Sequence, residues 1–149
     1  MRLRRGEIAD ITDMHRVRMA VLENTLSDSS LISQQDYERY LTEIGVGWVV
    51  EEAHEILGFA IGRLTDGNIW ALFVMPSAEQ RGIGRLLHQA MVSHLFSSGL
   101  TELWLSTTPK TRAEGFYLRH GWHHAAPHPE GEVRMVLSTS WQTATKPNN

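Results

Sequence analysis

The sequence contains no cysteine, and it contains no long apolar run. The first absence excludes disulfide bonds, thiolate nucleophiles and zinc–thiolate sites. The longest apolar run, residues 69–76, is far shorter than the roughly 20 residues that cross a bilayer. The basic amino-terminal segment has no apolar stretch behind it, so it does not read as a secretory signal. We therefore expect a cytoplasmic protein with no membrane partner.

A strong charge of either sign is also missing. Lysine and arginine number 14 against 17 aspartates and glutamates, which gives a formal net charge of −3. No global field then attracts the chain to nucleic acid, so we expect no nucleic-acid partner. The 42% hydrophobic and 21% charged residues are typical of a folded globular protein, and 149 residues fit one domain. We expect this domain over residues 1–138, followed by a flexible polar tail over residues 139–149.

Hydrophobic periodicity alternates between helical and strand spacing along the chain, without an internal repeat. Ser33 and Asp36 form a capping box at the start of one helix. Pro109 suits the first position of the last helix, and Thr111 with Glu114 offers an alternative capping box for it. The strands over 48–74 follow one another through short turns, which predicts an antiparallel meander. The expected strands cover residues 3–5, 48–52, 56–64, 69–74, 103–106, 122–125 and 133–137, and the expected helices cover 11–21, 34–44, 84–96 and a segment from 109 to 120.

The most informative segment is a buried strand that leads through Pro76 into Glu79-Gln-Arg-Gly-Ile-Gly-Arg85 and then a helix. Gly82 and Gly84 allow the backbone to approach ligand oxygens closely, and the helix N-terminus attracts anions. Arg81 and Arg85 add positive charge at the same place. The segment therefore predicts a site for a phosphorylated cofactor.

Two common phosphate-binding loops do not fit this segment. A P-loop requires Lys and then Ser or Thr after its last glycine, whereas Arg85 and Leu86 stand there. A dinucleotide fingerprint requires a third glycine at position 87, which is leucine. Both nucleotide-binding alternatives are excluded on sequence.

The order of elements, the segment 74–87 and the segment 113–122 together resemble the GNAT superfamily of acyl-CoA-dependent N-acetyltransferases. Gly82 and Gly84 match the two glycine positions of that family's loop pattern, while Glu79 stands where Gln or Arg is usual. The resemblance covers nearly the whole chain. It implies an α+β, GNAT-like fold, in which about four helices flank a mixed, mostly antiparallel central sheet of about seven strands.

The resemblance also implies acetyl-CoA as cosubstrate. By position, Tyr117 matches the tyrosine that donates a proton to the departing CoA thiolate, and a phenol is a neutral donor at pH 7. The implied cofactor-binding residues are Phe73, Val74, Gln80, Arg81, Gly82, Ile83, Gly84, Arg85, Ala113 and Phe116.

The acceptor side is less defined. The resemblance implies that a primary amine of a small molecule or a peptide attacks the thioester directly, in a ternary complex. Homodimers are common in the family, so a homodimer is one assembly that the resemblance allows. The strand 69–74 offers no glutamate as general base, so Glu23 is the first candidate, and a water chain ending at Ser106 or at a backbone carbonyl is the alternative. Trp70 and Ser106 are the candidate acceptor-binding residues.

Other functions remain open on sequence. The missing carboxylate on strand 69–74 is compatible with a catalytically weak domain that binds or senses acyl-CoA, and an interaction module with an incidental glycine turn is a third alternative. The eight histidines include His123 and His124, which point to opposite faces of a strand and cannot both join one coordination shell. We therefore expect no metal.

Overall fold

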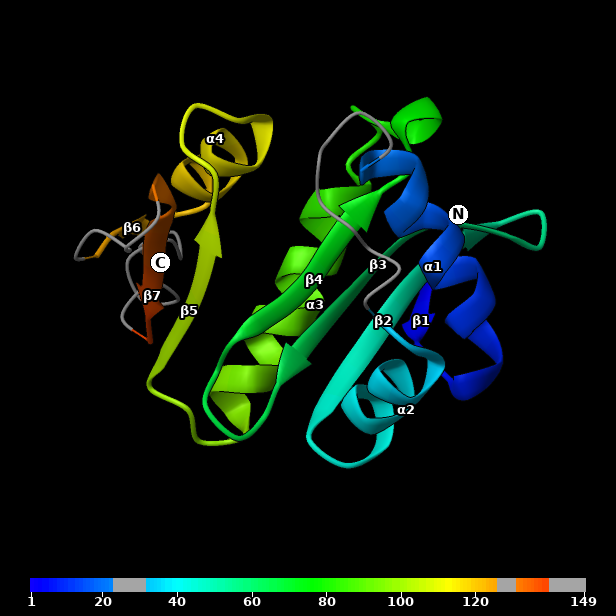
Figure 1. Ribbon diagram of the computed structural model, residues 1–149, viewed down its shortest axis with the longest axis horizontal. Helices are drawn as coiled ribbons and strands as arrows, with labels where there is room; N and C mark the ends of the chain where they lie inside the picture. Colours follow the sequence, from blue (N-terminus) through cyan, green and yellow to red (C-terminus); the bar gives the residue numbers. More distant parts are fainter. Residues whose placement is uncertain (23–31, 126–130, 140–149) are drawn as a thin grey trace, which may run out of the picture.

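The computed structural model describes residues 1–22, 32–125 and 131–139 (Figure 1). Within these ranges, none of the helices combines the length and the apolar character that crossing a bilayer requires. The elements run in the order β1 (Arg2–Arg5), η1 (Ile8–Asp10), α1 (Ile11–Leu22), α2 (Gln34–Thr42), β2 (Gly45–Glu52), β3 (Glu55–Arg63), β4 (Ile69–Val74), η3 (Pro76–Ala78), α3 (Ile83–Ser97), β5 (Glu102–Thr107), α4 (Arg112–Arg119), β6 (His123–His124) and β7 (Val133–Ser138).

The strands form two antiparallel sheets. One has the order β1-β2-β3-β4 and contains the predicted meander, and the other has the order β5-β7-β6. A parallel bridge between Asn68 and Trp104 joins them, and from there β4 and β5 diverge (Figure 1). The predicted α+β class is confirmed, with seven strands and four α-helices in the described ranges. The expected central sheet is divided in two because β4 and β5 separate beyond this bridge.

Helices cover both faces of the four-stranded sheet (Figure 1). α1 and α2 pack on one face, where Phe59 and Ile61 point, and α3 packs on the other. Gly58 and Gly62 of β3 face α3, and a Cβ added to Gly62 would lie 2.7 Å from a Leu95 methyl carbon. The missing side chains therefore let α3, which carries the glycine-rich loop at its start, lie close against the sheet.

The structure tests the predicted starts of two helices, α2 and α4. The capping box is confirmed, because the Asp36 amide donates to Ser33 Oγ and the Ser33 amide donates to the Asp36 carboxylate. Of the two predicted starts of the last helix, Pro109 is wrong and Thr111 is confirmed as the cap, since α4 begins at Arg112. Lys110 has φ of 63°, a left-handed conformation that a helix cannot contain. Thr111 caps the helix instead, by accepting the Glu114 amide on its hydroxyl.

Candidate functional site

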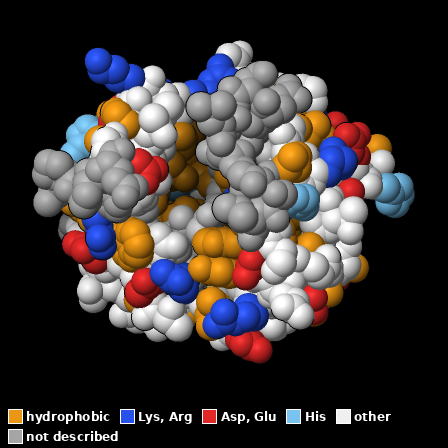
Figure 2. Space-filling view, viewed as in Figure 1, with side chains coloured by type: hydrophobic (Ala, Val, Ile, Leu, Met, Phe, Trp, Pro, Cys, Tyr) orange, Lys and Arg blue, Asp and Glu red, His pale blue; other side chains and the backbone are white. Residues whose placement is uncertain are grey.

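A cavity of about 450 Å³ opens where β4 and β5 diverge. Figure 2 shows the molecule hollowed near its centre, with hydrophobic side chains on the floor of the hollow. The walls come from the C-terminal half of β4, the loop before α3, the start of α3, and α4. The lining residues are Val21, Leu72, Phe73, Val74, Ala78, Glu79, Gln80, Gly82, Ile83, Gly84, Arg85, Arg112, Ala113, Phe116, Tyr117 and Arg119.

The glycine-rich loop forms one end of this cavity and turns directly into α3. Gln80 and Gly82 have φ of 64° and 82°, and Gly82 is the N-cap of the helix. A Cβ on Gly82 would meet nothing within 4 Å, so space does not require glycine there. Glycine is favoured because it adopts the left-handed backbone conformation without strain. A Cβ on Gly84 would lie 3.2 Å from the Phe116 ring, so glycine there lets α4 approach. The loop presents the free amides of a helix N-terminus to the cavity.

The charged side chains around the loop differ in whether they face the cavity. Arg85 lines the cavity, whereas Arg81 lies outside the lining and donates to Glu52 at 2.7 Å. Glu79, which replaces the usual Gln or Arg, forms an ion pair with Arg112 of α4. This ion pair joins the loop to α4 across the cavity mouth and draws the Glu79 carboxylate to Arg112.

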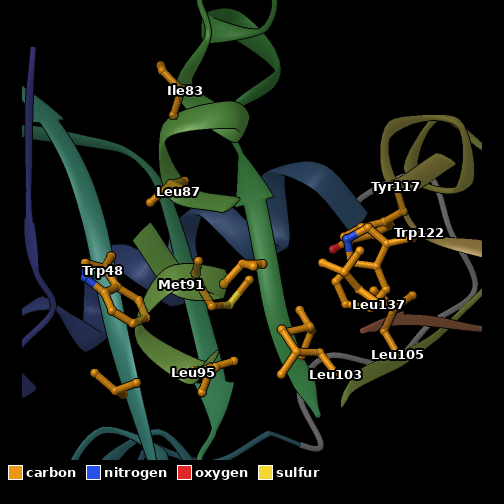
Figure 3. Close-up of a cluster of buried hydrophobic side chains, with 14 of the residues drawn as sticks. Trp48, Ile83, Leu87, Met91, Leu95, Leu103, Leu105, Tyr117, Trp122 and Leu137 are labelled. Atoms are coloured by element: carbon orange, nitrogen blue, oxygen red, sulfur yellow. The ribbon is translucent and has the colours of Figure 1, made fainter. Parts of the chain in front are cut away.

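Tyr117 projects from α4 toward the space beside β4 (Figure 3). It is buried but lines the cavity, and its ring packs edge-on against Phe116 and Trp122. Burial raises the pKa of the Tyr117 hydroxyl, because the phenolate would lose its hydration. Tyr117 is therefore a neutral phenol, able to donate a proton to an atom in the cavity.

His88 packs in the core behind the α4 wall of the cavity, and the sequence did not single it out as a site residue. It is a polar residue on the buried stripe of α3, where neighbouring positions are aliphatic, so its spacing alone predicts packing. Its Nε2 accepts the Trp122 indole N–H at 2.9 Å, which connects α3 to the segment after α4. Burial, with a smaller effect of His120, lowers the pKa of His88 to about 3. His88 is therefore neutral, with its ring proton on Nδ1.

The edge of β4 that faces the cavity carries backbone groups that no strand of the described residues pairs with. The Met75 amide donates to the Leu57 carbonyl of β3 at 2.7 Å. Because backbone direction alternates along an antiparallel strand, Phe73 also faces β3, whereas Leu72 and Val74 face away from it. The amide and carbonyl groups of Leu72 and Val74 thus point toward β5, which has diverged and does not pair with them.

The structure brings most of the predicted cofactor residues together but separates the acceptor candidates. Apart from Arg81, every residue predicted to bind the cofactor lines the cavity, and so does Tyr117. Trp70 and Ser106 do not line it: Trp70 stacks on Tyr40 with ring centres 4.0 Å apart, and Ser106 lies within the pairing of β5 with β7. Glu23 lies outside the described residues. Within the described ranges no cluster of three metal-ligating side chains occurs.

Comparison with models of protein families identifies the family of this chain. The model of the Acetyltransferase (GNAT) family matches residues 11–122, which include the cavity, so the chain belongs to this family. Membership makes the protein an acyltransferase of the EC 2.3.1 type, with acetyl-CoA as its cosubstrate. A comparison with curated protein sequences finds no match.

Solved structures of low sequence identity share the whole fold. The PaiA N-acetyltransferase of Thermoplasma acidophilum, crystallised with coenzyme A, is 14% identical, with a TM-score of 0.78 over 92% of this chain and 98% of that one. A GNAT-family acetyltransferase of Staphylococcus aureus is 15% identical, with a TM-score of 0.79 over 92% and 98%. The ribosomal-protein-S18-alanine N-acetyltransferase of Escherichia coli is 18% identical, with a TM-score of 0.72 over 92% of each chain.

Proposed function

We propose that this acetyltransferase moves the acetyl group of acetyl-CoA to a primary amine of a small molecule or a peptide, by direct attack in a ternary complex. One observation carries the proposal: a single cavity joins the glycine-rich helix N-terminus, the unpaired edge of β4 and the neutral phenol of Tyr117. An anion-binding end, a strip of backbone donors and acceptors, and a proton donor are what a phosphorylated thioester requires.

The cofactor is bound mainly by backbone. The amides at the start of α3 and the Arg85 guanidinium bind the pyrophosphate, and Arg85 supplies charge that the amides lack. The unpaired groups of Leu72 and Val74 pair with the amides of the pantetheine arm, as a neighbouring strand would. Ala113 and Phe116 of α4 cover the arm from the other side.

The chemistry follows from the same arrangement. The amine nitrogen attacks the thioester carbonyl carbon, and a backbone N–H on the β4 edge stabilises the oxygen that becomes negatively charged. When the tetrahedral intermediate collapses, the carbon–sulfur bond breaks and the Tyr117 hydroxyl gives its proton to the thiolate. Glu23, or a water chain ending at Ser106, removes the amine proton. No cysteine is present, which agrees with transfer that forms no thioester with the enzyme.

Two relatives support the proposal by what their names state. The Thermoplasma acidophilum protein was crystallised with coenzyme A, and the Escherichia coli protein acetylates an alanine of a ribosomal protein. The first supports the cofactor, and the second supports an amine as acceptor.

Calorimetric titration with acetyl-CoA tests the cofactor part. We expect wild-type binding and a loss of binding in Gly82→Asp, because the carboxylate repels the pyrophosphate. Gly99→Asp is the matched control: Gly99 is also left-handed, with φ of 110°, and a Cβ there would also meet nothing within 4 Å, but it lies beyond the other end of α3. Equal affinity in the two variants would remove the loop from the cofactor site.

Release of CoA thiol with a panel of amines tests the transfer. Wild-type protein is expected to turn over, and Tyr117→Phe is expected to lower kcat more than it changes the affinity for acetyl-CoA, since only a proton donor is lost. Tight acetyl-CoA binding without turnover of any amine would instead favour an acyl-CoA sensor. An unchanged kcat in Tyr117→Phe would leave Tyr117 a packing residue.

A further inference from the structure

Arg18 of α1 is a buried cation that neither the fold nor the proposed cofactor site uses. Its side chain is 6% exposed, and within the described residues its Nε and Nη2 have no hydrogen-bond partner. A buried guanidinium normally has its donors paired, because unpaired ones lose hydration without replacement. The unpaired Nε and Nη2 form the edge of the guanidinium that can grip both oxygens of a carboxylate.

Aromatic rings surround this guanidinium. Its central carbon lies 4.7 Å from the ring centre of Phe73, 5.0 Å from that of Trp70 and 6.0 Å from that of Tyr37. These ring faces attract the cation, and the Tyr37 hydroxyl also interacts with it, but Nε and Nη2 remain without a partner among the described residues. The rings therefore hold Arg18 in place and leave its bidentate edge unused.

Nearby carboxylates are engaged elsewhere. Asp13, on the same helix, pairs with Arg16, and Asp10 pairs with Arg4 at 2.8 Å. Arg16 itself also donates to the Ile56 carbonyl. Arg18 thus differs from the other arginine of this helix, whose guanidinium is paired and more exposed.

Arg18 lies directly behind the cavity wall on the side opposite α4. Phe73, the nearest ring, is a lining residue, and Val21, one helical turn after Arg18, is another. This wall faces Tyr117, across the place where the thioester would lie. A ligand in the cavity therefore lies against Phe73, whose ring packs on the guanidinium.

We infer that Arg18 binds a carboxylate of the acceptor, so that the acceptor is an amino acid or another small molecule carrying both an amine and a carboxylate. This inference rests on the proposed transfer reaction. Nε–H and Nη2–H donate in parallel to the two carboxylate oxygens, and the amine of the same molecule extends into the cavity toward the thioester. The aromatic walls fit a flat carboxylate on a hydrocarbon stem better than a hydrated phosphate, which needs more donors than this edge provides.

Binding of product analogues tests the inference without requiring turnover. The CoA-saturated protein is titrated with N-acetyl amino acids and with the same compounds as C-terminal amides, which differ only in the carboxylate. We expect the acids to bind roughly 10- to 100-fold more tightly than the amides, as for hydrogen bonds to a charged group. Arg18→Met should remove this preference and leave CoA affinity unchanged, and Arg18→Lys should retain part of it. Arg16→Met, which removes a cation from the same helix, should keep the preference.

The other outcomes of these titrations would contradict different parts of the inference. Equal binding of acids and amides to wild-type protein, or an acid preference that survives in Arg18→Met, would overturn the inference. Loss of the preference only in variants with a lowered Tm would also overturn it, by making Arg18 structural. Competition by inorganic phosphate as strong as by the acids would assign the site to anions in general. If the acids bind through Arg18 but no amine is acetylated, the transfer proposal fails and the carboxylate site stands.

Discussion

The buried His88 makes the stability of the fold depend on pH in a calculable way. Its pKa is about 3 in the folded protein, against 6.5 for an ordinary histidine. Below pH 6.5 the unfolded chain therefore binds a proton that the folded protein does not, and unfolding is favoured as pH falls. The contribution is complete above pH 6.5, declines by about 1.4 kcal/mol per pH unit, and stops changing below about pH 3. Between pH 7 and pH 5 the loss is about 2 kcal/mol.

Urea unfolding of wild-type protein and His88→Gln at pH 7 and pH 5 measures this loss. Glutamine can still accept the Trp122 indole N–H through its amide oxygen, but it does not titrate. We expect the free energy of unfolding of His88→Gln to fall by about 2 kcal/mol less than that of wild-type protein over this interval.

His123→Gln serves as the control for removing a histidine, since His123 is exposed on β6. This variant should follow the wild-type pH dependence. If His88→Gln and wild-type protein lose the same stability between pH 7 and pH 5, then His88 is protonated in the folded protein and the assigned acceptor role of its Nε2 is wrong.

Three further changes probe the loop and the core. Gly84→Ala should weaken acetyl-CoA binding in calorimetry, because its Cβ presses on Phe116, while the gain in helix propensity of about 1 kcal/mol keeps unfolding near the wild-type value. Glu79→Gln should tighten acetyl-CoA binding about two- to fivefold at low salt, because a negative charge is removed and Arg112 is freed, and 0.5 M salt should erase the gain. Gly62→Ala should cost about 1–3 kcal/mol in urea unfolding through overpacking against α3, and a neutral result would mean that the helix shifts freely.

The fold could be predicted well where the signals are local. Short turns between consecutive strand segments predicted the meander β2-β3-β4, and the Ser33 capping box marked the start of α2. The division into two sheets could not be predicted, because it depends on how far β4 and β5 pair after the bridge at Asn68. Pro109 and Thr111 both offered a start for α4, and the left-handed Lys110, which no sequence rule assigns, makes Thr111 the cap.

The candidate site divides in the same way. The loop around Gly82 and Gly84 could be predicted as a cofactor site, because binding there depends on consecutive residues and a helix start. The roles of His88 and Arg18 could not be predicted, since each lies on a helix stripe that otherwise predicts packing. Their chemistry comes from partners far along the chain: Trp122 for His88, and Phe73 and other rings for Arg18. The role of a buried polar side chain depends on its tertiary neighbours, and the spacing of residues along one helix does not predict those neighbours.

We expect the free edge of β4, as the described residues leave it, to couple the stability of the protein to acetyl-CoA binding. Among the described residues one isolated bridge joins the two sheets, and past it the backbone groups of Leu72 and Val74 face away from β3, where the proposed pantetheine arm would pair with them. A ligand that binds only the folded state, at a hundredfold excess over its Kd, adds about 2.7 kcal/mol to the free energy of unfolding. Proteases act on opened forms of a chain, so we expect saturating acetyl-CoA to slow the proteolysis of the purified protein.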